Sequence, residues 1–555
     1  MLSSFVLFTA LVGVITYLKT RKDNTDSKDG YFLGGRSLTG GVIGGSLMLT
    51  NLSAVNFVGM NAQSYAGNMS VMGWEVGSGL ALVIVALFLV PRYLKAGLTT
   101  IPDFLESRFD KGVKTFVTYL FLIGYVVNVL PPTLYSGALA IGAIFDVSGL
   151  FNVSNVGAIW ITVWAIGIIG SVYAIFGGLK AVAISDTLNG IGLVFAGLLV
   201  PVLGLVALGK GSFAVGLDTI MTKAPEKLNS LGADTDPVPF LTLFTGMILV
   251  NLYYWGTDQA IMQRALGAKN LKEGQKGVLM AGFLKVLTPF MVCIPGVIAC
   301  HLYGANKFEN ADMVYPALVN DIMPKALVGL FAAVMFGAIL STFNSVLNSA
   351  TTLFTLNVYK PLFGQGKTDH QLVKEGKLCG GVLAIAAMTI APFIMYAPQG
   401  LFQYLQIVNG FFNVPIFTII FMGYVTRRVP AIAAKIALAG FVATYALLQL
   451  VIKPEMHFLH QLAILFVASC GLMLVIGVFK KREVPFVLED KKVVNIEPWK
   501  YRHEAAIVVI ATMLAVYLLF SPLVASGSLV TVMTTLLVLT ALALAGLQWY
   551  RRSRV

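Results

Sequence analysis

The feature that most constrains this chain is a series of apolar runs, each about 20 residues long. Residues Ile191–Leu208, for example, are only Ile, Gly, Leu, Val, Phe, Ala and Pro. A helix made from such a run is long enough to cross the hydrocarbon core of a bilayer. Composition agrees, because only 12% of the residues are charged, about half the share found in soluble domains. The chain is therefore predicted to be an all-α polytopic membrane protein.

About fifteen spans are predicted, and the connections between them alternate in charge. The spans lie near residues 2–18, 39–66, 72–95, 114–144, 155–176, 182–208, 238–262, 277–302, 325–357, 375–397, 401–424, 430–452, 456–480, 503–524 and 527–550. Basic residues gather in alternate connections, such as 92–114, 264–276, 360–377 and 480–502. Positive loops stay on the cytoplasmic side, so we expect an outside N-terminus, a cytoplasmic C-terminus and a bacterial inner (plasma) membrane location. Basic residues follow the first apolar run, which favours an uncleaved first span over a signal peptide.

The same patterns exclude several function classes. The formal net charge is +13. The basic residues responsible for it lie in short loops beside spans, so they indicate the orientation of the chain in the membrane and not nucleic-acid binding. The four cysteines, Cys293, Cys300, Cys379 and Cys470, have no metal-site or disulfide spacing. The sequence contains no phosphate-binding loop and no catalytic constellation. We therefore expect a non-enzymatic protein that works in the lipid bilayer, and no obligate protein partner is evident.

The second span carries polar residues among glycines at its centre. Thr50, Asn51, Ser53 and Asn56 fall mid-membrane within Gly40–Gly59. Polar residues and helix weakeners together predict a discontinuous helix, whose free backbone groups hold ions or solutes. Close packing of unbroken helices on small residues is the alternative.

The seventh span has a comparable polar cluster at Asn251–Gln259. It lies five spans after the polar cluster of the second span. Because five is odd, a second unit that begins there is inverted relative to the first. The spacing predicts an inverted repeat built from spans 2–6 and 7–11.

The ninth span carries hydroxyl and amide side chains at helical spacing. They are Ser341, Thr342, Ser345, Asn348, Ser349 and Thr352, one turn or more after Ala338. Such a stripe lines a hydrated path or bonds neighbouring helices. A hard cation such as sodium prefers oxygen ligands of this kind.

Ionisable residues inside spans are few, and each is a functional candidate. Glu75 lies early in the third span and Lys285 inside the eighth. Lys285 requires an acceptor: a carboxylate, several carbonyls or a polyhydroxy ligand, unless it forms a purely structural pair with Glu75. Asp186, near the start of the sixth span, is either an ion relay or an interfacial helix cap. The aromatic faces of Trp74 and Tyr253–Trp255 are suited to stacking on a sugar ring.

At these residues the chain resembles the sodium:solute symporter family, and most closely its YidK-type bacterial branch. The likeness covers roughly residues 31–360 and continues more weakly to about 428. Its motifs are Tyr31-Phe-Leu-Gly-Gly-Arg-Ser-Leu38, Asn51-Leu-Ser-Ala54, Ile101-Pro-Asp-Phe-Leu-Glu106, Gly177-Gly-Leu-Lys-Ala181 with Asp186, Asn251-Leu-Tyr-Tyr-Trp-Gly256 and Leu347-Asn-Ser349. The resemblance implies a five-plus-five inverted-repeat (LeuT-type) core that works by alternating access.

The resemblance also implies site residues. Sodium is expected on the carbonyls of Leu49, Leu52 and Ala338 and the hydroxyls of Ser341 and Thr342, with Asp186 near the ion exit route. The implied substrate-binding positions are Asn56, Glu75, Ser78, Asn128, Asn251, Lys285 and Gln406. Tyr254 matches the inner gate tyrosine, with Asn51 as its polar partner. The chain has Val55-Asn56 where the galactose transporter has Glu-Gln, so one carboxylate acceptor for sugar hydroxyls is missing.

The predicted function is sodium-coupled uptake of a small polar solute, most simply a monosaccharide such as galactose or glucose. A sugar acid or organic acid is the alternative substrate, because Lys285 could pair with its carboxylate, and a passive uniporter or channel is the alternative mechanism. The expected organisation is a leading helix and loop (1–38), a first repeat (39–208), an inverted second repeat (238–424) and peripheral C-terminal helices (425–555).

Overall fold

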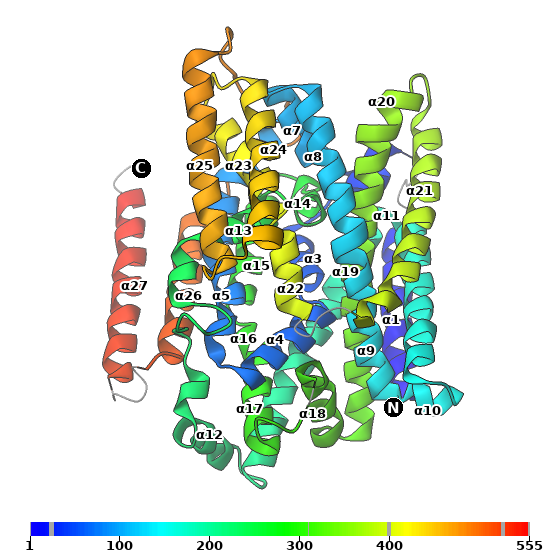
Figure 1. The fold of residues 1–555 in the computed structure, drawn as a ribbon, viewed down its shortest axis with the longest axis vertical. Coiled ribbons are helices and arrows are strands. Elements are labelled where there is room, and N and C mark those ends of the chain that lie inside the picture. The colour runs from blue at the N-terminus through cyan, green and yellow to red at the C-terminus, as the bar shows by residue number, and fades with distance from the viewer. Residues whose placement is uncertain (1, 22–26, 309, 397–400, 523–527, 553–555) are drawn as a thin grey trace.

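The computed structural model describes residues 2–21, 27–308, 310–396, 401–522 and 528–552, and this part of the chain is a bundle of long helices (Figure 1). The helices that cross the bundle are α1 (Leu2–Thr20), α3 (Gly40–Asn51), α4 (Ala54–Ala66), α5 (Gly73–Ile84), α6 (Val90–Lys95), α8 (Lys111–Ile123), α9 (Leu130–Phe145), α11 (Asn155–Leu208), α13 (Gly246–Gly256), α14 (Gln259–Leu266), α15 (Leu271–Val286), α16 (Pro289–Val292), α17 (Ile294–Tyr303), α19 (Lys325–Leu353), α21 (Asp369–Ile390), α22 (Leu401–Asn409), α23 (Asn413–Val425), α24 (Ala431–Leu447), α25 (Phe458–Phe479), α26 (Arg502–Leu519) and α27 (Leu529–Arg552). Shorter helices connect them: α2 (Lys28–Leu33), α7 (Ile101–Arg108), α10 (Val147–Phe151), α12 (Phe213–Thr222), α18 (Val314–Ile322) and α20 (Lys360–Phe363). Within the described ranges strand pairing is limited to two isolated bridges.

The number of spans agrees closely with the sequence prediction. Among the described residues, 12 helices are long and apolar enough to cross a membrane, or up to 14 if each bent pair counts as one span. The predicted span at 238–262 falls on α13 and α14, which have 11 and 8 residues and are each too short to cross alone. The start of α1 and the end of α27 lie at opposite faces of the bundle (Figure 1).

The predicted break in the second span is present. Helices α3 and α4 meet at an angle of 55°, and Leu52 and Ser53 between them are not helical. Ser53 and Asn56 form a reciprocal capping box that starts α4 and satisfies backbone donors that the break frees. The eighth predicted span is also bent, by 42° between α15 and the helices that follow it.

Helix α11 joins the fifth and sixth predicted spans through a kink at Gly178 and not through a loop. Gly178 has φ 63° and ψ −177°, a backbone conformation open mainly to glycine. A Cβ there would lie 3.0 Å from the carbonyl oxygen of Tyr31, so glycine is required both by the backbone angle and by close contact.

The centre and the edge of the bundle differ sharply in burial. In the most apolar window of the α19 span 78% of the residues are buried, whereas in α27 none is. Helix α3 packs closely against α15: a Cβ on Gly277 would lie 2.5 Å from the Ile43 Cβ, and one on Gly44 3.0 Å from the Gly277 carbonyl. Small residues allow this approach, which holds the broken helix beside the helix that carries Lys285.

Candidate functional site

A cavity of about 200 Å³ lies where the broken helices face one another. Its wall includes the α3–α4 break, α5, α13 and α22. Six predicted substrate positions line it, namely Asn56, Glu75, Ser78, Asn128, Asn251 and Gln406, together with the predicted gate residues Asn51 and Tyr254. The structure thus gathers residues that are more than 300 positions apart in the sequence.

Lys285, the seventh predicted substrate position, does not line the cavity. Its side chain is fully buried behind Glu75, with which it forms an ion pair, and it also donates to Asn51 Oδ1. Glu75 further accepts from Thr288 Oγ1 at 2.5 Å and from Asn56 Nδ2 at 3.3 Å. The acceptor that Lys285 requires is therefore a carboxylate of the protein, and only the carboxylate faces the cavity.

The remaining polar residues form two short hydrogen-bonded groups on the cavity wall. Ser78 Oγ donates to Asn251 Oδ1 at 2.7 Å. Asn128 donates to Asn409 Oδ1 at 2.8 Å, and Asn409 donates to Gln406 Oε1 at 3.2 Å. Asn409 was not predicted, although its spacing of three residues from Gln406 on one helix was a signal for it.

Aromatic rings complete the cavity wall. Trp74, Tyr253, Tyr254 and Trp255 all line it, as their pattern in the sequence predicted. The Tyr254 side chain interacts with Asn51, so the two expected gate residues do meet. Asn51 thereby touches both the aromatic wall and Lys285.

Among the predicted sodium ligands, Thr342 contacts the last turn of α3 and also lines the cavity. Thr342 Oγ1 donates to the Thr50 carbonyl at 2.8 Å and to the Ala338 carbonyl at 3.3 Å. Among the described residues no backbone hydrogen bond reaches the carbonyls of Leu49 or Leu52, because the helix ends there. These free carbonyl oxygens and the hydroxyls of α19 are the ligand type that a hard cation takes.

Two buried oxygens beside these ligands also lack a hydrogen bond. They are Ser341 Oγ and Asp186 Oδ1, and the Ser341 hydroxyl lies near the Asp186 carboxylate. Unpaired buried oxygens are costly, so an oxygen-seeking cation at this position would satisfy both. Asp186 lies well inside α11 and is 1% exposed, so its interpretation as an interfacial cap is wrong.

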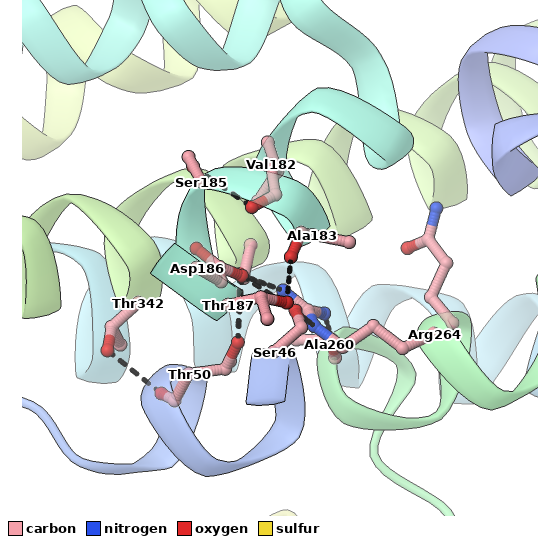
Figure 2. Close-up of polar contacts among 12 residues, drawn as sticks. Ser46, Thr50, Val182, Ala183, Ser185, Asp186, Thr187, Ala260, Arg264 and Thr342 are labelled. Atoms are coloured by element: carbon pink, nitrogen blue, oxygen red, sulfur yellow. Dashed lines mark hydrogen bonds and ion pairs between the residues drawn. The ribbon is translucent and has the colours of Figure 1, made fainter. Parts of the chain in front are cut away.

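Asp186 is paired on its other side with an arginine that the sequence analysis assigned to a cytoplasmic loop. Arg264 is fully buried in α14, and its Nη2 lies 3.4 Å from Asp186 Oδ2. Ser46 Oγ donates to the same carboxylate oxygen at 2.7 Å; Figure 2 shows Asp186 among Ser46, Thr50 and Arg264. The predicted loop 264–276 was wrong at its start, because a short half-helix of mixed composition carries no strong apolar signal.

Asp258 is an acidic residue of the cavity wall that sequence analysis did not single out. It caps α14 by accepting from the backbone of Ala260 at 2.9 Å, and it also accepts from the hydroxyls of Tyr125 at 3.0 Å and Tyr253 at 3.2 Å. Its position directly before a helix was the available signal.

Comparison with known proteins agrees with this geometry. The family model of the sodium:solute symporter family matches residues 31–443. The chain is 48% identical to the uncharacterized symporter YidK of Escherichia coli, over 93% of this chain and 90% of that one. It is 31% identical to the sodium/glucose cotransporter of Vibrio parahaemolyticus, over 82% of this chain and 86% of that one.

The fold has a solved counterpart. The substrate-bound outward-open state of a sodium-coupled sialic acid symporter superposes with a TM-score of 0.72 at 20% identity, covering 87% of this chain and 98% of that one. The expected inverted-repeat symporter fold is therefore confirmed. The chain belongs to the sodium:solute symporter family, and sodium is its coupling ion.

Proposed function

We propose that this symporter imports a neutral polyhydroxy solute, of the size of galactose or glucose, by alternating access. The observation that carries the proposal is the charge of the cavity wall. Its carboxylate lining residues are Glu75 and Asp258, and among the described residues no Lys, Arg or His lines it. Lys285 neutralises Glu75 from behind. A carboxylate on a substrate would therefore meet acidic groups and no free cation, which disfavours sugar acids and organic acids.

The polar residues match a polyol in number and type. Amides and hydroxyls such as Asn56, Ser78 and Asn251 both donate and accept, as sugar hydroxyls do. The rings of Trp74 and Tyr254 offer apolar faces for the C–H side of a pyranose. The sodium/glucose cotransporter of Vibrio parahaemolyticus supports the same substrate class.

Sodium is proposed to bind the carbonyls of Leu49, Leu52 and Ala338 and the hydroxyls of Ser341 and Thr342, with Asp186 beside them. Thr50 and Asn51 are consecutive residues, and they link the two sites: Thr50 contacts Thr342, and both residues line the cavity. An ion that fixes the end of α3 also fixes one wall of the cavity, which provides a route for coupling.

The orientation of the chain in the membrane and the boundaries of its two repeats are part of the proposal. An outside N-terminus and a bacterial inner membrane follow from the basic connections. The proposed repeats, 39–208 and 238–424, each begin with a broken helix, α3–α4 and α13–α14, which supports their equivalence. Residues 1–38 and 425–555 flank them.

Uptake into proteoliposomes tests the substrate class. The full-length protein is given labelled galactose, glucose, myo-inositol or galacturonate, with an inward sodium gradient, with equal sodium on both sides, or with none. Stimulation of a neutral sugar or polyol by the gradient is expected. Stimulated uptake of galacturonate alone would replace the neutral substrate by an acid. Equal fluxes with and without the gradient would indicate a uniporter or channel.

The Asn251→Ala variant is the matched control in this assay. Asn251 lines the cavity and contacts Ser78, and it is not among the proposed sodium ligands. The variant is expected to lose specific uptake and to retain sodium binding, which separates cavity-mediated flux from leak.

A further inference from the structure

The ion pair between Asp186 and Arg264 is enclosed on every side. The two side chains are 1% and 0% exposed. A carboxylate at such a depth requires a cation or several donors. Asp186 joins α11 to α3 through Ser46 and Thr50, and Arg264 adds α14 to the same cluster.

The oxygens around the Arg264 guanidinium form a set that would suit a metal cation. Nε donates to Ser46 Oγ at 2.8 Å, Nη2 donates to Ser345 Oγ and contacts Asp186 Oδ2 at 3.4 Å, and Nη1 donates to the Ala260 carbonyl. One carboxylate oxygen, two hydroxyls and a carbonyl are hard oxygen ligands. In this chain the guanidinium, which is positively charged, lies among them (Figure 2).

The two oxygens of Asp186 face different partners. Oδ2 accepts from Ser46 and pairs with Arg264, whereas Oδ1 lacks a hydrogen bond, as does the nearby Ser341 Oγ. Arg264 therefore fixes the carboxylate so that its second oxygen stays beside the proposed sodium ligands.

We propose that Arg264 is a tethered cation that occupies the oxygen cluster around Asp186, so that the protein binds a single sodium ion. Arg264 is a positioning residue for that ion: it holds Asp186 beside Ser341 and keeps a second cation out. This inference rests on the proposed sodium site and deepens it by assigning its stoichiometry.

Charge changes at the pair make the proposal testable. Arg264→Gln leaves the Asp186 carboxylate without its cation and vacates the oxygen cluster, so a second sodium ion is expected to bind. Asp186→Asn leaves the guanidinium without its counter-ion, and sodium affinity is expected to fall about tenfold or more through repulsion. Asp186→Asn combined with Arg264→Gln removes both charges and is expected to return the protein to one sodium ion.

The experiment is equilibrium binding of radioactive sodium to the purified full-length protein, without any substrate. One ion per chain with a Hill coefficient near 1 is expected for the wild type and for Arg264→Lys, which keeps the charge. Two ions or a Hill coefficient clearly above 1 are expected for Arg264→Gln alone. The matched control is Arg92→Gln, since Arg92 is exposed at the end of α6.

The outcomes separate this inference from the function on which it rests. Two ions per wild-type chain would overturn the inference and leave sodium coupling intact. No bound sodium in the wild type would contradict the sodium site itself and this inference with it. One ion per chain in Arg264→Gln would also overturn the inference, because the vacated oxygen cluster would then have taken no cation. Should Arg264→Gln not be recovered, Arg264→Ala, which vacates the same oxygens, is measured in the same way and interpreted by the same criterion.

Discussion

The chain contains two buried ion pairs on either side of the α3 terminus, and they differ in what they leave open. Glu75 lines the cavity, and Lys285 pairs with it from behind. Asp186 and Arg264 are enclosed, and one carboxylate oxygen has no hydrogen bond. In the proposed function, the first pair presents a hydrogen-bonding surface to the solute and the second presents an oxygen ligand to the ion.

Adjacent residues connect the two pairs. Thr50 Oγ1 lies 3.4 Å from Asp186 Oδ2, and Asn51 Oδ1 accepts from Lys285. Each residue belongs to the last turn of α3, directly before the break. The comparison teaches that the end of one broken helix contacts both buried ion pairs, so that a single backbone segment connects the proposed ion site with the proposed solute site.

The largest effect should come from removing Lys285. In Lys285→Met the Glu75 carboxylate loses its cation, and loss of one partner of a buried pair costs about 3–5 kcal/mol. Solute uptake should fall about 100-fold or more, whereas sodium binding should change less than about threefold because the other pair is intact. Uptake in proteoliposomes and radioactive sodium binding measure the two effects.

The double variant Glu75→Gln, Lys285→Met is the control for folding, because it contains no unpaired charge. It should be recovered in higher yield than Lys285→Met and still transport poorly. Uptake at the wild-type rate by Lys285→Met would contradict the comparison of the two ion pairs, since the Glu75–Lys285 pair would then have no role in solute transport.

A large effect on the ion side is expected from Ser341→Ala combined with Thr342→Ala. These changes remove two proposed sodium ligands and the hydrogen bond to the Thr50 carbonyl. The sodium concentration for half-maximal uptake should rise about 10- to 100-fold, at about 1.4 kcal/mol per factor of ten. Sodium titration of the uptake rate measures it.

Ser349→Ala provides the matched control on the same helix. Its hydroxyl donates to Gln263 at 2.6 Å and is not among the proposed sodium ligands, so the sodium requirement should stay at the wild-type value. An unchanged requirement in the Ser341/Thr342 variant as well would place the ion elsewhere.

A moderate effect confined to the solute is expected from Ser78→Ala. The change removes one cavity hydroxyl and its hydrogen bond to Asn251, and a neutral hydrogen bond contributes about 0.5–1.5 kcal/mol. KM for the solute should rise about 3- to 10-fold with the sodium requirement unchanged. A parallel rise in the sodium requirement would show that the two sides are not separable.

The smallest effect is expected from Tyr254→Phe. The variant keeps the aromatic face and loses the hydroxyl that interacts with Asn51. KM should change by no more than about threefold, whereas Tyr254→Leu, which lacks the ring, should raise KM about tenfold. Equal effects of both changes would argue against stacking and for a role of the hydroxyl alone.

Sequence alone predicted the features that depend on local composition. Apolar runs predicted the spans, and the glycines and polar residues around Thr50 predicted the break, because both signals lie in contiguous residues. Glu75 and Lys285 were identified because ionisable groups in an apolar run are rare.

Sequence analysis did not predict the features that depend on contacts between distant parts of the chain. Asp186 and Arg264 are 78 residues apart, and nothing local indicates that α14 is buried. The position of Lys285 behind the cavity likewise depends on how α15 packs against α5. A pattern along one helix identifies candidate side chains, but the neighbouring helices determine which of their atoms are free.

The most direct test of the account is the affinity for the transported solute measured without sodium and at saturating sodium on the purified protein. Because Thr50 and Asn51 join the two sites, sodium is predicted to tighten solute binding by about 5- to 150-fold, the usual range of such coupling. In the Ser341/Thr342 variant this increase should be lost while binding without sodium persists. Equal affinities with and without sodium in the wild type would contradict the account, because the end of α3 would then transmit nothing between the ion and the solute.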